Sequence, residues 1–165
     1  MHSLNKFMRK GSIMDLLFLC VIAFIFGLGV IVSYHIVTQI NATATLGTDA
    51  TYILTKSQTA IGTFNYGFLI IFFGLGIATI IFAFMIPSHP IFIISGLLTL
   101  VVLMIIIPIY SNAFESITTS PELSTAAASF GMMNYVMSEL PLFSAVIGVI
   151  ILIVMFIKWR GQGTE

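Results

Sequence analysis

Residues 68–110 read FLIIFFGLGIATIIFAFMI, then PSHP, then IFIISGLLTLVVLMIIIPIY. This stretch sets two predominantly apolar runs, residues 68–86 and 91–110, on either side of a four-residue break, without one acid, lysine or arginine. A helix rises about 1.5 Å per residue, so each run is long enough for the roughly 30 Å hydrocarbon core of a bilayer. The stretch therefore predicts two membrane-spanning helices joined by a tight turn.

The break itself is specified by its two prolines. Pro87 ends the first helix, and Pro90 is suited to the first turn of the second because its missing N–H is not needed there. Pro90 also biases His89 away from helical geometry. We expect Pro87, His89 and Pro90 to form the turn of a rigid hairpin, with His89 as a polar turn residue and not a catalyst.

The composition of the whole chain extends this interpretation. Its 165 residues are 59% hydrophobic and 7% charged, with a mean hydropathy of +1.14, whereas a soluble domain carries about 25% charged residues. The apolar residues run continuously instead of alternating, which argues against the strands of a transmembrane barrel. The sequence predicts an all-α polytopic membrane protein that forms one domain over residues 1–165.

Four spans are predicted, at about residues 14–39, 64–86, 90–111 and 138–158. The first follows the basic segment MHSLNKFMRK. Because this span is longer than the apolar region of a typical signal peptide, we expect it to be retained as a helix.

The basic residues predict the orientation of the four spans. Lys6, Arg9 and Lys10 precede the first span, and Lys158 and Arg160 follow the last. The two longer connections carry the sixth base together with four acids. Basic residues collect on the cytoplasmic side, so we expect both termini there, or on a side derived from the cytoplasm. The opposite side is called the outer side below.

Both connections on the outer side carry helical signals. Apolar positions in residues 50–64 recur near helical spacing, so the second span is expected to begin early as an amphipathic extension. In SPEL, Ser120 can cap a short helix from about 121 to 130, ended near Gly131. Together these segments are expected to cover the outer end of the bundle. The residues expected on the buried face of the short helix are Leu123, Ala126, Ala127 and Phe130.

Small residues are the candidates for helix packing, because in lipid close approach of backbones matters more than the hydrophobic effect. They recur four apart in three of the spans, and one stands in the remaining span. We expect them to face neighbouring helices or another subunit. They are Ala23, Gly27, Gly29, Ser33, Gly74, Ala78, Gly96, Ser144 and Gly148.

The sequence offers no constellation that predicts catalysis, a cofactor or a metal. His35 and His89 are expected on opposite membrane faces, about 30 Å apart, which is too far for one metal ion. The span interiors hold hydroxyls and almost no ionisable group, so no polar transport path is evident. Zero net charge argues against a general attraction to nucleic acid. These features predict a protein that is not an enzyme.

Three groups of residues carry a resemblance to known proteins: KGSIMDLLF at 10–18, SHPIFIISG at 88–96 with IYSNAFESI at 109–117, and MNYVMSELPLFSAVIGVIILIV at 133–154. The chain resembles small four-helix membrane proteins of viruses with an internal lipid membrane. The resemblance implies a structural virion component that organises the lipid vesicle or links it to the capsid. It implies lipid and other membrane or capsid subunits as partners, in a homo- or hetero-oligomer.

Two other functions fit the same residues. An accessory subunit of a larger membrane enzyme or translocation complex needs the same packing faces. A holin-like pore requires an oligomer whose subunits together line a polar path. The identity of the protein's partners distinguishes an accessory subunit from a virion component. Ion conductance across a membrane distinguishes a pore from both.

Overall fold

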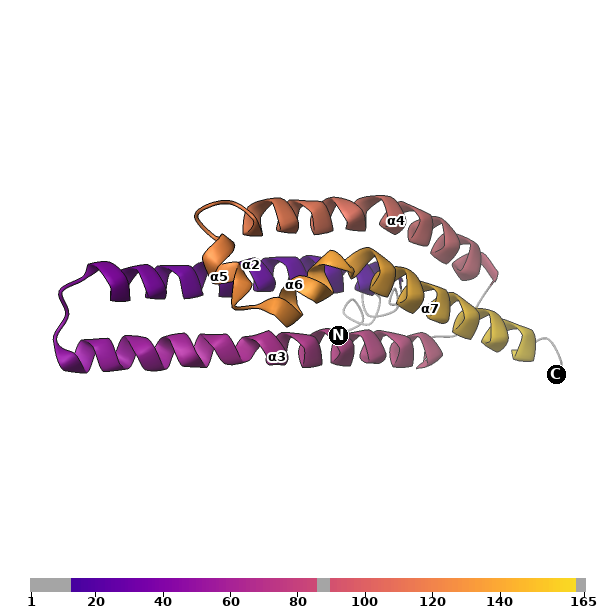
Figure 1. Cartoon of the computed structure of the whole chain (residues 1–165). Helices are drawn as coiled ribbons and strands as arrows, with labels where there is room; N and C mark the ends of the chain where they lie inside the picture. Colours follow the sequence, from indigo (N-terminus) through magenta and orange to yellow (C-terminus); the bar gives the residue numbers. More distant parts are fainter. Residues whose placement is uncertain (1–12, 86–89, 163–165) are drawn as a thin grey trace, which may run out of the picture.

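The structure, a computed structural model, describes residues 13–85 and 90–162. Over these ranges the chain forms helices and no strand, which confirms the predicted all-α class. Figure 1 shows an elongated bundle of long helices with shorter helices lying among them. In chain order the helices are α2 (Ile13–Thr43), α3 (Thr48–Met85), α4 (Pro90–Thr118), α5 (Ser124–Ala128), α6 (Gly131–Ser138) and α7 (Leu140–Gln162).

The four long helices correspond to the four predicted spans. Each is long and apolar enough to cross a membrane. The largest difference in bounds is at α3, which begins at Thr48, well before the predicted start at residue 64, as the helical spacing of residues 50–64 suggested. At 38 residues, α3 is about 57 Å long. It is therefore longer than a bilayer core is thick, and Figure 1 shows the α2–α3 pair extending beyond the other helices.

The helices on either side of PSHP do not pair in the way the sequence predicted. Instead of packing as a hairpin, α3 and α4 lie on opposite sides of the bundle, and each packs against α2 and α7 (Figure 1). The reason is that α7 lies between α3 and α4, where the side chain of Ile147 and its neighbours fill the space between the two helices. Pro90 begins α4, whereas Pro87 and His89 lie outside the described residues.

The connection between α4 and α7 also differs from the prediction. Its first helix, α5, begins at Ser124 and not at residue 121, because the carbonyl of Ser120 accepts hydrogen bonds from the backbone N–H groups of Leu123 and Ser124 in a turn. Gly131, predicted to end the helical segment, begins a second helix, α6. Ala126, Ala127 and Phe130 are buried, as predicted.

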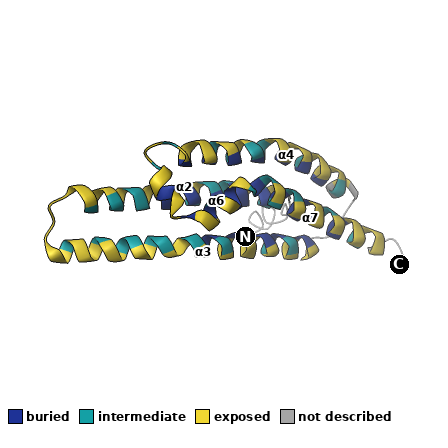
Figure 2. Ribbon diagram, viewed as in Figure 1, coloured by how far each residue is buried: buried dark blue, intermediate teal, exposed yellow. Residues whose placement is uncertain are grey.

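The sequence analysis missed α6, although α6 forms much of the core. Its Met133, Val136 and Met137 are fully buried, and the helix packs against α3 and α4. The ring of Phe130, just before α6, meets Tyr34 of α2 edge-on at 5.1 Å between centroids. Figure 2 shows the buried surfaces facing inward, while the outward faces of the long helices are exposed and, for the most part, apolar.

Both ends of α6 are held by side chains from other helices. The Asn65 side-chain oxygen on α3 accepts hydrogen bonds from the backbone N–H groups of Met132 and Met133, each at 3.1 Å. At the other end, the Ser111 hydroxyl on α4 contacts the carbonyls of Met137 at 2.9 Å and Ser138 at 3.1 Å. Helix ends leave backbone groups without partners, and in an apolar setting each unpaired group is costly. Asn65 and Ser111 satisfy groups that α6 cannot satisfy alone.

Replacing Asn65 with alanine is expected to lower the free energy of unfolding by about 1–2 kcal/mol, because two N–H groups lose their acceptor. Unfolding in mixed micelles, followed by circular dichroism, measures the effect. Asn65→Asp is the matched control, since it retains an oxygen that accepts both bonds and suits a helix N-terminus. Equal losses in the two variants would contradict the capping role.

Candidate functional site

The predicted packing residues of α2 separate into a pair that faces the interior of the bundle and a pair that faces away from it. Ala23 is buried beside Phe68 and Phe72 of α3. At Gly27 there is little room for a side chain, because a Cβ would lie 3.3 Å from the Phe114 ring of α4. Ala23 and Gly27 therefore let α2 approach its neighbours within the bundle.

Gly29, Ser33 and Gly74 face away from the bundle. A Cβ at Gly29 or Gly74 would have no atom within 4 Å. Ser33 is exposed, and its hydroxyl donates to the Gly29 carbonyl of the same helix at 2.7 Å. Within residues 13–85 and 90–162, Gly29 and Gly74 therefore have open space where a side chain would stand, and Ser33 lies on the surface. Their predicted role at a subunit interface stays a prediction.

On α3 the inward-facing small residue is Gly76, which the sequence analysis did not select. A Cβ there would lie 3.0 Å from the Ile147 side chain of α7, and Thr79 and Ala83 continue the buried face. The predicted Ala78 is only partly buried. The spacing of Gly74 and Ala78 identified a small-residue face, but not the one that packs.

The centre of the bundle lies around two adjacent residues of α7. Ile147 contacts α3 at Gly76, and a Cβ at Gly148 would collide with Leu100 of α4 and lie 3.5 Å from Leu16 of α2. Ser144, one turn earlier, is buried and donates to the Pro141 carbonyl at 3.0 Å. Gly96 of α4 is buried as well. The predicted residues Ser144 and Gly148 thus lie where α7 meets the other long helices.

The basic residues at the end of α7 differ in their contacts. Lys158 donates a hydrogen bond from Nζ to the Phe84 carbonyl in the last turn of α3, which satisfies one helix-end carbonyl. Arg160 is exposed. Trp159 packs against Phe156, with 5.9 Å between the ring centroids. Lys6, Arg9 and Lys10 lie outside the described residues.

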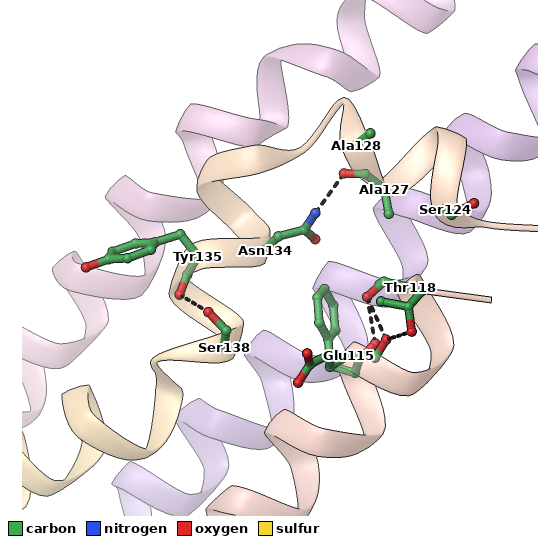
Figure 3. Close-up of a pocket in the computed structure, with 10 residues that line it drawn as sticks. Glu115, Thr118, Ser124, Ala127, Ala128, Asn134, Tyr135 and Ser138 are labelled. Carbon is green, nitrogen blue, oxygen red and sulfur yellow. Dashed lines mark hydrogen bonds between the residues drawn. The ribbon is translucent and has the colours of Figure 1, made fainter. Parts of the chain in front are cut away.

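Two hollows open on the outer side. The first, of about 510 Å³, lies between α4, α5 and α6 and is drawn in Figure 3; it is called the outer hollow below. The second, of about 360 Å³, lies between α2 and the segment that carries α5, and it has His35 and Glu122 in its lining. No group of three histidine, cysteine or acidic residues able to hold a metal ion occurs in residues 13–85 and 90–162. The sequence analysis did not predict either hollow.

No protein-family model matches the chain, and no curated protein or solved structure is significantly similar to it. The class of protein is therefore defined by the fold alone. Four apolar helices, each able to cross a membrane, are packed through small residues and closed on the outer side by α5 and α6. This is the architecture of a multi-pass integral membrane protein.

Gly148→Ile is expected to lower the free energy of unfolding by about 1–3 kcal/mol, because the added side chain overpacks the junction of α7, α4 and α2. Mixed-micelle unfolding measures this change. Gly62→Ile is the matched control, since a Cβ at Gly62 has no atom within 4 Å. If both variants unfold like the wild type, the α7 junction is not closely packed.

Proposed function

We propose that the protein is a structural, non-enzymatic component of a membrane, assembled laterally into oligomers in the internal lipid membrane of a virion. There it organises the lipid vesicle or links it to the capsid. The observation that carries the proposal is the division of its small residues. One set packs the bundle, and Gly29, Ser33 and Gly74 are open on its outward surface.

The outward small residues of α2, Gly29 and Ser33, form a face suited to contact between subunits. Small residues let helix backbones approach closely, and van der Waals packing is the main attraction between helices in lipid. Ser33 already donates its hydroxyl hydrogen to its own helix, so it presents little unsatisfied polarity to a neighbour. A homo-oligomer or a hetero-oligomer with another membrane subunit both use this face.

Basic residues collect at one end of the bundle, which suits a membrane protein that lies beneath a protein shell. Lys158 and Arg160 lie at the end of α7, on the same side as the start of α2. Lys6, Arg9 and Lys10 precede α2 in the sequence. In a vesicle whose cytoplasm-derived leaflet faces outward, these bases point toward the capsid, where acidic groups of shell proteins are their partners.

A second candidate, an accessory subunit of a larger membrane complex, is favoured by the extended part of α3. Tyr52 and Ile53 are 64% and 63% exposed there, beyond the length that a bilayer covers. Large apolar side chains in that position suit contact with a partner on the outer side. Purification in mild detergent distinguishes the candidates, because a stably associated catalytic subunit favours the second.

Gly29→Ile is expected to weaken lateral association at least about tenfold, because a β-branched side chain holds neighbouring backbones apart. Energy transfer between labelled chains in liposomes, measured against lipid dilution, reports the association. The unfolding free energy of the same variant should match the wild type, since Gly29 is open in the bundle. Gly62→Ile adds the same bulk on α3 and is expected to associate normally. Normal association of Gly29→Ile would exclude this face as the interface.

The virion assignment predicts that purified particles contain the protein in many copies in their membrane fraction. Quantitative mass spectrometry against a labelled standard measures the copy number relative to the capsid protein. Absence from the particles, with the protein present in the membranes of the producing cell, would overturn the virion assignment.

A further inference from the structure

The outer hollow has a polar lining that the structural role does not explain. It lies where α4 ends at Thr118, bounded by α5 and α6. Figure 3 shows Glu115 from α4 and Asn134 from α6 on facing sides of this space, with Tyr135 directed away from both. Its lining also includes the apolar side chains of Phe114 and Ala127. The chemistry of the lining can be worked out group by group.

Asn134 presents an acceptor without a partner. Its Nδ2 donates to the Ala127 carbonyl at 2.8 Å. A carbonyl only accepts, so this bond determines which end of the amide is nitrogen and turns Oδ1 the other way. Oδ1 is buried and has no hydrogen-bond partner among the described residues. A buried acceptor without a partner raises the free energy of the folded state. A ligand that donates a hydrogen bond to this oxygen would remove that cost.

The serine and threonine hydroxyls of the lining are acceptors as well. Each donates its hydrogen to a backbone carbonyl, which leaves only its lone pairs for a ligand. Thr118 donates to Phe114 at 2.9 Å, Thr119 to Glu115 at 2.7 Å, and Ser138 to Tyr135 at 3.0 Å. Together with Asn134 they line the hollow with oxygen atoms that accept.

The charge of the lining also favours a ligand that donates hydrogen bonds. Glu115 places a carboxylate in the last turn of α4, at the negative end of the helix dipole. Among the residues that the structure describes, no lysine, arginine or histidine contributes to the lining. The hollow therefore suits a cation with several N–H donors and disfavours an anion.

We propose that the outer hollow binds a primary ammonium group, supplied by the headgroup of an ethanolamine lipid. An alkylammonium carries one positive charge and three N–H donors, which match the Glu115 carboxylate, Asn134 Oδ1 and a lining hydroxyl. The lipid source follows from position, because the hollow lies at the end of the membrane-spanning helix α4, and the apolar part of its lining suits the carbon atoms beside the ammonium. A choline headgroup carries the same charge but no N–H donor.

Native mass spectrometry of the full chain, released from detergent with defined lipids, tests the proposal. The probes are phosphatidylethanolamine, phosphatidylcholine and phosphatidylglycerol with identical acyl chains. Phosphatidylethanolamine is expected to bind about tenfold more tightly than phosphatidylcholine, because charge-assisted hydrogen bonds are lost with the methylated headgroup. Glu115→Gln should reduce this preference to about twofold or less. Equal binding of the three lipids by the wild type would overturn the proposal.

Glu122→Gln is the matched control, since Glu122 is an outer-side acid that does not line the outer hollow. It is expected to keep the full preference, and a loss equal to that of Glu115→Gln would overturn the site. Thermal unfolding of both variants verifies that they are folded. Free ethylammonium, added at the concentration of the lipid, separates the two sources. Weak competition supports the headgroup, and complete displacement assigns the site to soluble amines instead.

Discussion

The structure depends on one constraint, which is that backbone polar groups removed from water must find partners inside the protein. A continuous helix meets this requirement by itself, and the four long helices do so over most of their length. Between α4 and α7 the helical chain is interrupted three times, at residues 119–123, 129–130 and 139, so this segment cannot meet the requirement by itself. Asn65 and Ser111 supply the missing partners at the two ends of α6. Because those two side chains hold the ends of α6, this short helix can close the outer end of the bundle.

A second level of organisation is the arrangement of helices around α7. Helices adjacent in sequence, α3 and α4, are not the ones that pack together, because α7 lies between them and meets both. Gly148 permits close approach on one side of α7, and Ile147 fills the space at Gly76 on the other. The helix α7 therefore completes the described bundle and holds apart α3 and α4, which are consecutive in the sequence.

The long helices were predictable because their signal is local: a run of apolar residues long enough for a bilayer. The early start of α3 was also visible as helical spacing in residues 50–64. What sequence reasoning missed depends on distant partners. Gly131 is a helix-stopping signal in isolation, but the Met133 N–H that follows is bonded to Asn65, 68 residues earlier. Likewise, spacing alone does not decide whether Gly74 or Gly76 faces inward, since that depends on where Ile147 lies. The outer hollow has no sequence signature, because its lining comes from three helices.

The chain order of the α6 contacts has a consequence for biosynthesis. Asn65 and Ser111 both precede α6 in the sequence, so a ribosome completes each of them before α6 exists. When α6 emerges, α3 and α4 can already be in the membrane, with the Asn65 acceptor and the Ser111 donor both in place. The segment most in need of outside partners is made after those partners, and α7, which packs against α3 and α4, is made last. Both ends of α6 can therefore be satisfied as soon as α6 is made, whereas the Phe84 carbonyl near the end of α3 meets Lys158 only after α7 has followed.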